Sequence, residues 1–537
     1  MLSSLEFFPT KIPREGPTRS GPSHNASRFL GSQKSRGMVA SMSPFNNPVV
    51  LDLLAGYKSV AAMAHASSLL GWDLEINMPE AGANARGQAQ SEIELLRQKM
   101  TIDLTGPVEK AEKLKALNDA EKGVVRVVKR ELNYYQKVPP KLVEELQKAT
   151  IEANIPWREA RKKSDFNIFK PHLEKITELK REEASHLDPS GNPYNSLLDL
   201  SEEGLRTTDL DKIFSELIPQ LKKILAKTLS NGVFPKKHPL EEVDYDVNSL
   251  KQVNQKILQL LGMPEKRFRQ DVSTHPFAIR IGSDDVRITT RYEPKDFKSS
   301  MFGLMHECGH ALYELQVDHE LQFTPTASGV SAGVHESQSR FWENIVGRSK
   351  EFVPLLYPLL KTNLSFVARY DQKQLYSYFN TVKPSLIRVE ADELTYNFHI
   401  AMRYELEKKL LQGKIKVSEL PSVWNDMIED YLGKRPEKDA DGVLQDIHWS
   451  WGQFATFPGY SLGNIIAGML WSALTKKGLL PVKSDKSVAP LKSWLAENIH
   501  KPGSTYSPKE LLDRVFGKGY DPSGLVGYLE NKYLAMN

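Results

Sequence analysis

Residues 299–317 read SSMFGLMHECGHALYELQV and are the most informative stretch of this chain. They contain the pattern H-E-x-x-H at His306 to His310, inside a mainly apolar run that predicts a helix. Positions i and i+4 share one face of a helix, so the two histidines can bind one Zn²⁺ from the same side. Glu307 points off that face, where it can take the proton of a zinc-bound water as the water attacks a carbonyl group. Histidines in an apolar helix need polar partners, and a metal ion would supply one.

Zinc needs a third protein ligand, and the residues after His310 narrow the choice. Tyr313 and Gln316 stand where the metzincin pattern would have glycine and histidine, so that class is excluded. Glu336, in the run VHESQSR, is the candidate third ligand, and an ordinary acid on a helix face is the alternative. Arg340 follows it one helical turn later and would hold the carboxylate in orientation.

The pattern on both sides of this stretch is mainly helical. The strongest strand signal is Asp285–Tyr292, where β-branched residues alternate along the run. A turn-rich patch occurs at Asp188–Pro193. Amphipathic or Ala-rich helices are expected over 49–70, 92–99, 110–135, 141–151 and 209–229. The chain therefore predicts a mainly α fold.

Length and composition limit the class of protein. The 537 residues are 40% hydrophobic and 26% charged, which is ordinary for a globular protein. We expect residues 46–537 to form one large helical catalytic unit, with a helical part at 46–200 and the metal and substrate motifs at 201–537. The longest mainly apolar stretch, Tyr460–Leu474, is too short for a membrane span. A single cysteine, Cys308, excludes an intrachain disulfide.

The formal net charge of +4 comes entirely from the first fifty residues. These hold six Lys or Arg and two Asp or Glu, and the rest of the chain has 65 of each kind. The body therefore gives no indication of nucleic acid or an anionic membrane as a partner.

The N-terminal segment has the composition of a targeting sequence. It is poor in acids and contains nine serines, so residues 1–45 are predicted to be a transit peptide. A chloroplast is favoured over a mitochondrion because the segment is rich in Ser and Pro and lacks a clear Arg-bearing amphipathic helix. The alternatives are a disordered tail, or translation from Met38 or Met42, which would leave the protein in the cytoplasm.

The chain resembles the carboxypeptidase Taq family of zinc metallocarboxypeptidases, and its leader would make it a plant or algal organellar member. The resemblance extends from about residue 50 to the end of the chain. Six motifs carry it in order: HPF at 275–277, DVRIT at 285–289, HECGH at 306–310, HESQ at 335–338, IRVEAD at 387–392 and GVLQDIHW at 442–449.

The resemblance implies a large helical metallopeptidase fold with a deep groove, a small β-sheet beside the H-E-x-x-H helix, and a homodimer. It implies one Zn²⁺ per chain, bound by His306, His310 and Glu336, with Glu307 as the general base. Co²⁺ would fit the same ligands. The implied reaction is the stepwise removal of C-terminal residues from peptides with broad specificity.

An exopeptidase also needs a fixed cation for the terminal carboxylate of its substrate. The guanidinium group suits this task because its planar fork binds a carboxylate through two hydrogen bonds. Arg287 and Arg388 lie in matching motifs and are the candidates. The alternative for each is a structural ion pair, with Asp285 or Asp392 respectively.

Amide hydrolysis further needs a group that stabilises the oxyanion. His448 and Tyr460 are the candidates for this role or for binding the scissile residue, and His275 is a candidate for shaping the substrate site. The chain departs from the family pattern here, because it reads ATFPGY at 455–460 where GYFPSY would be expected.

Two other functions would use the same residues. One is a zinc endopeptidase or oligopeptidase, against which the two candidate arginines argue. The other is a non-catalytic relative that only binds peptides, which the complete set of proposed ligands and base disfavours.

Overall fold

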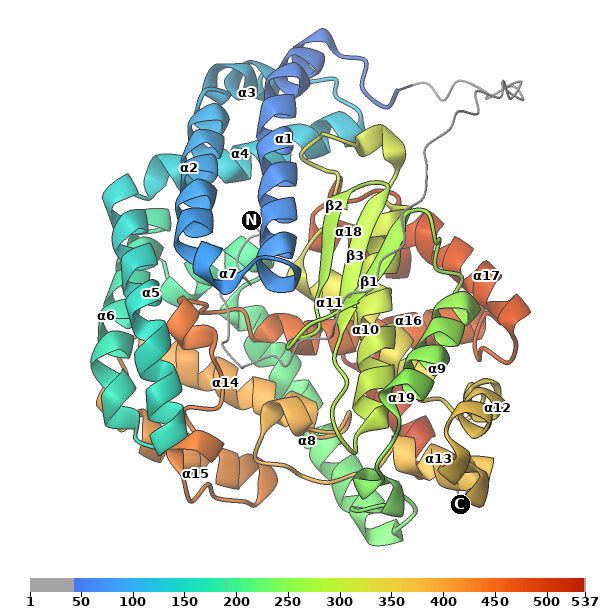
Figure 1. Cartoon of the computed structure of the whole chain (residues 1–537). Coiled ribbons are helices and arrows are strands. Elements are labelled where there is room, and N and C mark those ends of the chain that lie inside the picture. The colour runs from blue at the N-terminus through green and yellow to red at the C-terminus, as the bar shows by residue number, and fades with distance from the viewer. Residues whose placement is uncertain (1–42, 190, 536–537) are drawn as a thin grey trace, which may run out of the picture.

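The computed structural model describes residues 43–189 and 191–535. Residues 1–42, most of the predicted transit segment, lie outside the described residues. Helices make up most of the remainder, as predicted (Figure 1). The helices are α1 (Pro48–Ile76), α2 (Ala83–Ile102), α3 (Thr105–Glu112), α4 (Asp119–Lys137), α5 (Pro140–Lys163), α6 (Phe166–Leu187), α7 (Pro193–Ser201), α8 (Thr207–Asn231), α9 (Val247–Leu260), α10 (Phe297–Gln316), α11 (Ala332–Arg340), α12 (Val353–Asn363), α13 (Gln372–Phe379), α14 (Tyr396–Leu411), α15 (Leu420–Leu432), α16 (Pro458–Lys476), α17 (Asp485–Leu495), α18 (Pro508–Phe516) and α19 (Ser523–Leu534).

Most predicted helices lie inside observed ones, but the helix predicted at 110–135 is wrong as a single element. Residues 113–118 separate α3 from α4. The break occurs because Asn118 starts a new helix: its side chain accepts a hydrogen bond from the Glu121 N–H, and the Glu121 carboxylate accepts one from the Asn118 N–H. The same carboxylate accepts the N–H groups of Asn46 and Asn47, which fixes the chain where it enters α1.

Helix α1 is unusually long and apolar. By length and composition alone it could cross a membrane, so Tyr460–Leu474 is not the apolar stretch that decides this question. The core helix of a soluble protein meets the same criterion. In the structure α1 packs against α2, α3 and the β-sheet (Figure 1).

The sheet has three short strands in the order β1 (Phe268–Val272), β3 (Asp285–Thr290) and β2 (Ala278–Gly282). Strand β1 runs parallel to β3, and β2 runs antiparallel to it. The strand predicted at 285–292 is thus confirmed as β3, while β1 and β2 were not predicted because each has only five residues and a weak pattern. Strand β3 packs against α10, which places the sheet beside the H-E-x-x-H helix, as expected.

Three helices that are distant in sequence meet at the centre of the molecule. Helix α11 packs against α10 on one side and against α16 on another. Two glycines allow this close approach. A Cβ atom at Gly309 of α10 would collide with the backbone of Gln338 and Ser339, and one at Gly463 of α16 would lie 2.6 Å from Cγ of Glu336.

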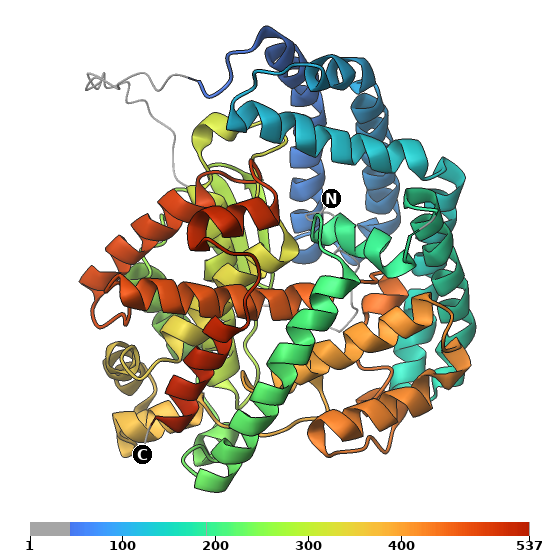
Figure 2. The ribbon, with the colours of Figure 1, turned by 180° about the vertical axis from the view of Figure 1, so that it is seen from behind.

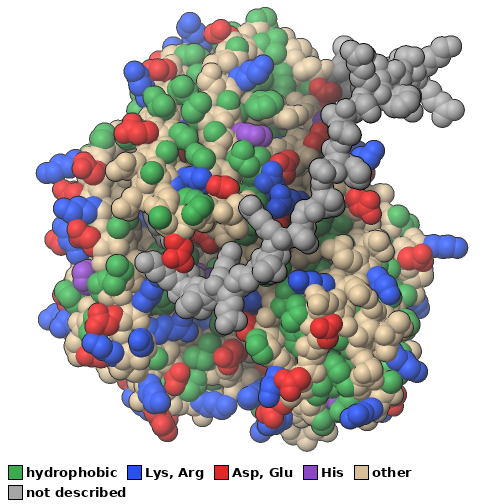
Figure 3. All heavy atoms as spheres, in the orientation of Figure 1, with side chains coloured by type: hydrophobic (Ala, Val, Ile, Leu, Met, Phe, Trp, Pro, Cys, Tyr) green, Lys and Arg blue, Asp and Glu red, His purple; other side chains and the backbone are tan. Residues whose placement is uncertain are grey.

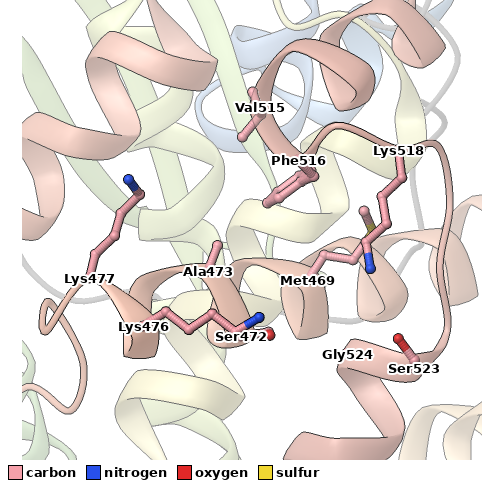
Figure 4. Close-up of a pocket in the computed structure, with 10 residues that line it drawn as sticks. All are labelled: Met469, Ser472, Ala473, Lys476, Lys477, Val515, Phe516, Lys518, Ser523 and Gly524. Carbon is pink, nitrogen blue, oxygen red and sulfur yellow. The ribbon is translucent and has the colours of Figure 1, made fainter.

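The back of the molecule is closed by the C-terminal helices. Helix α19 packs against both α16 and α8, and Figure 2 shows α8 and α19 running along this side. A cavity of about 340 Å³ lies between α16, α18 and the start of α19, with Met469, Phe516, Lys476 and Lys518 among its lining residues (Figure 4). On the face drawn in Figure 3, basic and acidic side chains are interspersed, in keeping with the neutral body of the chain.

Candidate metal centre and substrate site

Three predicted ligands converge where α10 and α11 cross. The Nε2 atoms of His306 and His310 lie 3.6 Å and 3.5 Å from Oε2 of Glu336. All three ligand atoms lie within 4.8 Å of one another. Ligands about 2.0–2.1 Å from a tetrahedral ion would be separated by about 3.3 Å, so the group fits a divalent metal closely.

The imidazole of His306 is held in place through Nδ1, the ring nitrogen that faces away from the three converging ligand atoms. Its Nδ1 lies 2.9 Å from Oε2 of Glu343, in the π-helical turn Phe341–Gly347 that continues α11. The other oxygen of Glu343 accepts from Arg348 at 2.9 Å. Burial opposes ionisation of Glu343, but the hydrogen bond from His306 and the charges of Arg348 and Arg340 hold its pKa well below the ordinary value. The carboxylate therefore keeps the Nδ1 proton in place and leaves Nε2 free for a metal.

His310 is oriented by a longer chain of hydrogen bonds. Its Nδ1 lies 2.6 Å from Nδ1 of His335, and Nε2 of His335 lies 2.8 Å from Oε1 of Glu314. Because a carboxylate can only accept, His335 donates to Glu314 and must accept from His310. This order also leaves Nε2 of His310 without a proton, as metal binding requires.

The carboxylate of Glu336 is held by the cation predicted to orient it. Nε of Arg340 lies 2.7 Å from Oε1 of Glu336, while Oε2 faces the two histidines. Burial raises the pKa of Glu336, but the charge of Arg340 and the adjacent imidazoles of His306 and His310 more than offset this and keep its pKa well below the usual range. Glu336 is thus ionised at neutral pH and suited to bind a cation.

Arg388 lies in a buried basic group near the metal ligands. Its Nε donates to Asp446 at 2.8 Å and its Nη1 to the hydroxyl of Tyr396 at 3.0 Å. Arg403 donates to the other oxygen of Asp446 at 2.6 Å. Two guanidinium groups therefore share one carboxylate. Tyr396 links this group to the metal ligands, because the guanidinium of Arg340 lies 4.5 Å from the centre of its ring.

The alternative partner expected for Arg388 is wrong. Asp392 instead accepts hydrogen bonds from the backbone N–H groups of Lys383, Leu394 and Thr395. Asp446, four residues into the last motif, takes its place, and sequence spacing could not show that a residue 58 positions away folds back onto Arg388.

His448 and Tyr460 lie together beside Arg388. Nε2 of His448 lies 3.2 Å from the hydroxyl of Tyr460, and the guanidinium of Arg388 lies 5.4 Å from the centre of the Tyr460 ring. Burial, followed by the charge of Arg388, lowers the pKa of His448 to about 3. The imidazole is therefore neutral at physiological pH. Its Nδ1 is buried with no hydrogen-bond partner among the described residues.

A model of the carboxypeptidase Taq (M32) metallopeptidase family matches residues 52–533. This chain belongs to that family. It is 46% identical to thermostable carboxypeptidase 1 of Pyrococcus furiosus over 91% of this chain and 99% of that protein. It is 36% identical to thermostable carboxypeptidase 1 of Thermus thermophilus over 90% of this chain and 98% of that protein.

Solved structures of the family have the same fold. The Pyrococcus furiosus carboxypeptidase superposes with a TM-score of 0.89 over 91% of this chain and 100% of that chain. The M32 carboxypeptidase of Deinococcus radiodurans, 32% identical, has a TM-score of 0.85 over 91% of this chain and 99% of that chain. The protein is therefore a metal-dependent carboxypeptidase of the M32 family, as the motifs predicted, rather than an endopeptidase or a non-catalytic relative.

The remaining two predicted substrate residues lie on or beside the small sheet. Arg287 of β3 forms two hydrogen bonds, of 2.7 Å and 2.6 Å, with its neighbour Asp285 and lies over the ring of Trp72 of α1. The expected alternative, a structural pair with Asp285, is thus present. His275 lies at the exposed turn between β1 and β2, outside the group of three ligands.

Sequence reasoning missed three residues that orient the metal ligands. Glu314 lies four residues after His310, so helical spacing alone places it on the face of the two histidines. Glu343 lies two helical turns after Glu336, so helical spacing likewise places these two side chains on one face. His335 stands inside a matched motif, but only the tertiary structure shows that its ring joins His310 to Glu314.

Proposed function

We propose that His306, His310 and Glu336 bind one Zn²⁺ per chain, and that this ion serves the carboxypeptidase reaction. The observation that carries the proposal is the convergence of two imidazole Nε2 atoms and one carboxylate oxygen, each held from behind by its own partner. Two imidazoles and one carboxylate favour Zn²⁺ over Mg²⁺ or Ca²⁺, which prefer oxygen ligands. Co²⁺ could replace it. When bound, the ion supplies Lewis-acid activation of water and of the scissile carbonyl.

Glu307 is proposed as the general base. It follows His306 directly, is buried, and contributes its negative charge to the electrostatic environment of that histidine. Glu307 takes a proton from the attacking water and passes it to the leaving amine, which must be protonated before it departs.

Arg388 is the proposed clamp for the terminal carboxylate of the substrate, in preference to Arg287. In the group of Arg388, Arg403 and Asp446, two buried guanidinium groups share one carboxylate, and a buried guanidinium is stabilised by an incoming anion. The fork of Arg287 is already engaged by Asp285. Arg287 is therefore proposed to connect α1 to the sheet at the edge of the substrate site.

His448 and Tyr460 are proposed to contact the scissile residue and its developing oxyanion. The contact between Nε2 of His448 and the hydroxyl of Tyr460 holds these two side chains together beside Arg388, the proposed site of the substrate's terminal carboxylate. His275, at its exposed turn, is proposed to border the substrate further out.

The localisation and assembly of the protein are proposals that rest on composition and resemblance. Residues 1–45 are proposed as a chloroplast transit peptide, with a mitochondrial address, or a cytoplasmic protein starting at Met38 or Met42, as alternatives. We also propose that the protein is a homodimer, and that it acts on peptides and not on nucleic acid or membranes. Light scattering of the purified protein tests the homodimer. Import of the full chain into isolated organelles tests the localisation.

The central proposal is tested by metal analysis and substrate comparison on the same preparation. The purified enzyme should contain one Zn²⁺ per chain by mass spectrometry and should cleave a free-acid peptide much faster than the same peptide with a C-terminal amide. A preparation without metal affinity would refute the metal site. Equal rates on the acid and the amide would refute the clamp.

A further inference from the structure

Glu407 is a fully buried acid that belongs to none of the groups described above. It lies on α14, and its two oxygens contact two points of the segment 448–460. Oε1 accepts from the indole N–H of Trp449 at 2.8 Å, and Oε2 accepts from the backbone N–H of Ala455 at 3.0 Å. The hydroxyl of Tyr194 also donates to Oε2, at 3.4 Å.

The segment that Glu407 contacts carries both His448 and Tyr460. Trp449 is the neighbour of His448 in the chain, and Ala455 lies midway to Tyr460. Ala455 has φ = 59°, in the left-handed region that a residue with a Cβ atom rarely adopts. Such a conformation persists only where the surroundings hold it, and the hydrogen bond from its N–H to Glu407 is a contact that does so.

All three neighbours of the Glu407 carboxylate are donors. An ionised carboxylate, the form of Glu407 that predominates above about pH 7, can accept all of them, whereas an amide of the same shape would direct its own N–H groups at one of them. The two contacts to the segment are therefore specific to the acid and would not be reproduced by packing alone.

We propose that Glu407 is a positioning residue for the substrate half of the active site, because it fixes the segment 448–460 at Trp449 and Ala455 so that His448 and Tyr460 face Arg388. The proposal rests on the function proposed for His448. It predicts that loss of the carboxylate affects the handling of the substrate and leaves metal binding unchanged.

Glu202 provides a matched control on the metal half of the site. It is also fully buried, and it accepts the N–H of Gly333 at the start of α11 and the hydroxyl of Tyr520 at 3.0 Å. Helix α11 carries His335 and Glu336. A carboxylate of the same burial and similar donors thus contacts the start of the helix that carries the proposed ligand Glu336, and not the segment 448–460.

The test compares Glu407→Gln with Glu202→Gln. For Glu407→Gln we expect kcat/KM on a free-acid peptide to fall about tenfold or more, because a small displacement of substrate-positioning groups has effects of this size. Its dissociation constant for Zn²⁺, measured with a chelator, should equal that of the wild type. For Glu202→Gln we expect the Zn²⁺ affinity to fall about tenfold. If Glu407→Gln keeps wild-type kcat/KM, or weakens Zn²⁺ binding as Glu202→Gln does, the inference is overturned.

A double-mutant cycle separates positioning from general stability. If Glu407 acts through His448 and Tyr460, adding Glu407→Gln to the variant that already carries His448→Ala and Tyr460→Phe should lower kcat/KM less than twofold further. A full tenfold further loss would mean that Glu407 supports the fold in general.

Trp449→Phe provides a second test if Glu407→Gln does not fold. It removes one hydrogen-bond donor to Glu407 and keeps Glu407 itself, and it should lower kcat/KM about threefold. An unchanged kcat/KM in that variant would count against the inference.

The same data distinguish this inference from the proposed function. If His448→Ala retains wild-type kcat/KM, the role proposed for His448 fails, and the inference fails with it. If His448→Ala is strongly impaired and Glu407→Gln is not, only the inference fails.

Discussion

Glu307 and Glu336 are both buried carboxylates of the metal site, but their surroundings give them different roles. Glu336 faces both histidines and is held by Arg340, whereas Glu307 is absent from the group of ligand atoms that lie within 4.8 Å of one another. The side chain proposed to complete the ligand set and the one proposed to move a proton can therefore be separated by mutation.

We expect Glu307→Gln to keep its metal and to lose activity by a factor of about 10²–10⁴, because the ligands remain while the base is removed. Glu336→Ala should do the reverse and lower the affinity for metal. Metal content by mass spectrometry and kcat on one peptide, measured side by side, check both variants. Loss of metal from Glu307→Gln would show that Glu307 is structural. Wild-type metal affinity in Glu336→Ala would place the third ligand elsewhere.

The proposed clamp for the terminal carboxylate of the substrate can also be tested by replacing single residues. Arg388→Lys keeps the charge and removes the planar fork, so it should weaken a charge-assisted contact by about 1.5–3 kcal/mol and lower kcat/KM on the free acid roughly 10–100-fold. The rate ratio of acid to amide should fall with it, and metal content should not change.

Arg287→Lys is the matched control for the clamp. Because Arg287 pairs with Asp285 and lies over Trp72, its replacement should lower thermal stability and leave the ratio of acid to amide at the wild-type value. If the rate ratio of acid to amide were lost in Arg287→Lys and kept in Arg388→Lys, the residue that binds the terminal carboxylate would be Arg287 of β3.

At the scale of elements, the site depends on how closely α10 and α11 approach each other. The two histidines come from α10 and Glu336 from α11, so the distance between the helix axes sets the distance between the ligands. Gly309 permits the contact, because a side chain there would meet the backbone of α11 at Gln338 and Ser339.

Gly309→Ala should separate the two helices and weaken Zn²⁺ binding about tenfold or more, as loss of ligand-supporting contacts does. Overpacking at the crossing should also lower the free energy of unfolding by about 1–3 kcal/mol. Gly303→Ala, on the same helix with open space around its Cβ position, should be neutral or stabilising by up to about 1 kcal/mol. Chelator competition and thermal unfolding measure both effects. Equal behaviour of the two variants would show that the close crossing is unimportant.

At the scale of the whole molecule, buried acids make the stability depend on pH. Burial raises the pKa of Glu407 to about 7, although Trp449 and Ala455 donate hydrogen bonds to it. The folded state therefore holds this proton more tightly than the unfolded chain does. The contribution of Glu407 to stability is greatest below the unfolded value of 4.5 and is lost as the pH rises to about 7.

The difference in the free energy of unfolding between the wild type and Glu407→Gln should accordingly change with pH. Relative to the variant, the wild type should lose about 3 kcal/mol between pH 4.5 and pH 7.5, since one pKa unit corresponds to about 1.4 kcal/mol. Above that range the difference should be constant. Denaturant unfolding of the two proteins across this range measures it, and a difference that does not vary with pH would contradict a raised pKa.

Several features of this protein can be read from the sequence alone because they depend on residues that are close together in the chain. The H-E-x-x-H helix, the pairing of Glu336 with Arg340 one turn later, strand β3 and the predominance of helices all follow from spacings of a few residues. The family follows from the order of six short motifs. The strands β1 and β2 were missed because their local signals are weak, and the break between α3 and α4 was missed although the capping pair Asn118 and Glu121 marks it.

The tertiary structure alone decided which distant residues meet. It joins His335 to His310, Asp446 to both Arg388 and Arg403, and Glu407 to the segment that carries His448. None of these contacts has a fixed spacing in the chain, because each depends on the packing of separate helices and on where small residues allow them to approach. The sequence by itself therefore determined which reactive side chains the protein has. The fold determined which other residues orient those side chains, because contacts between distant segments arise only when the helices pack together.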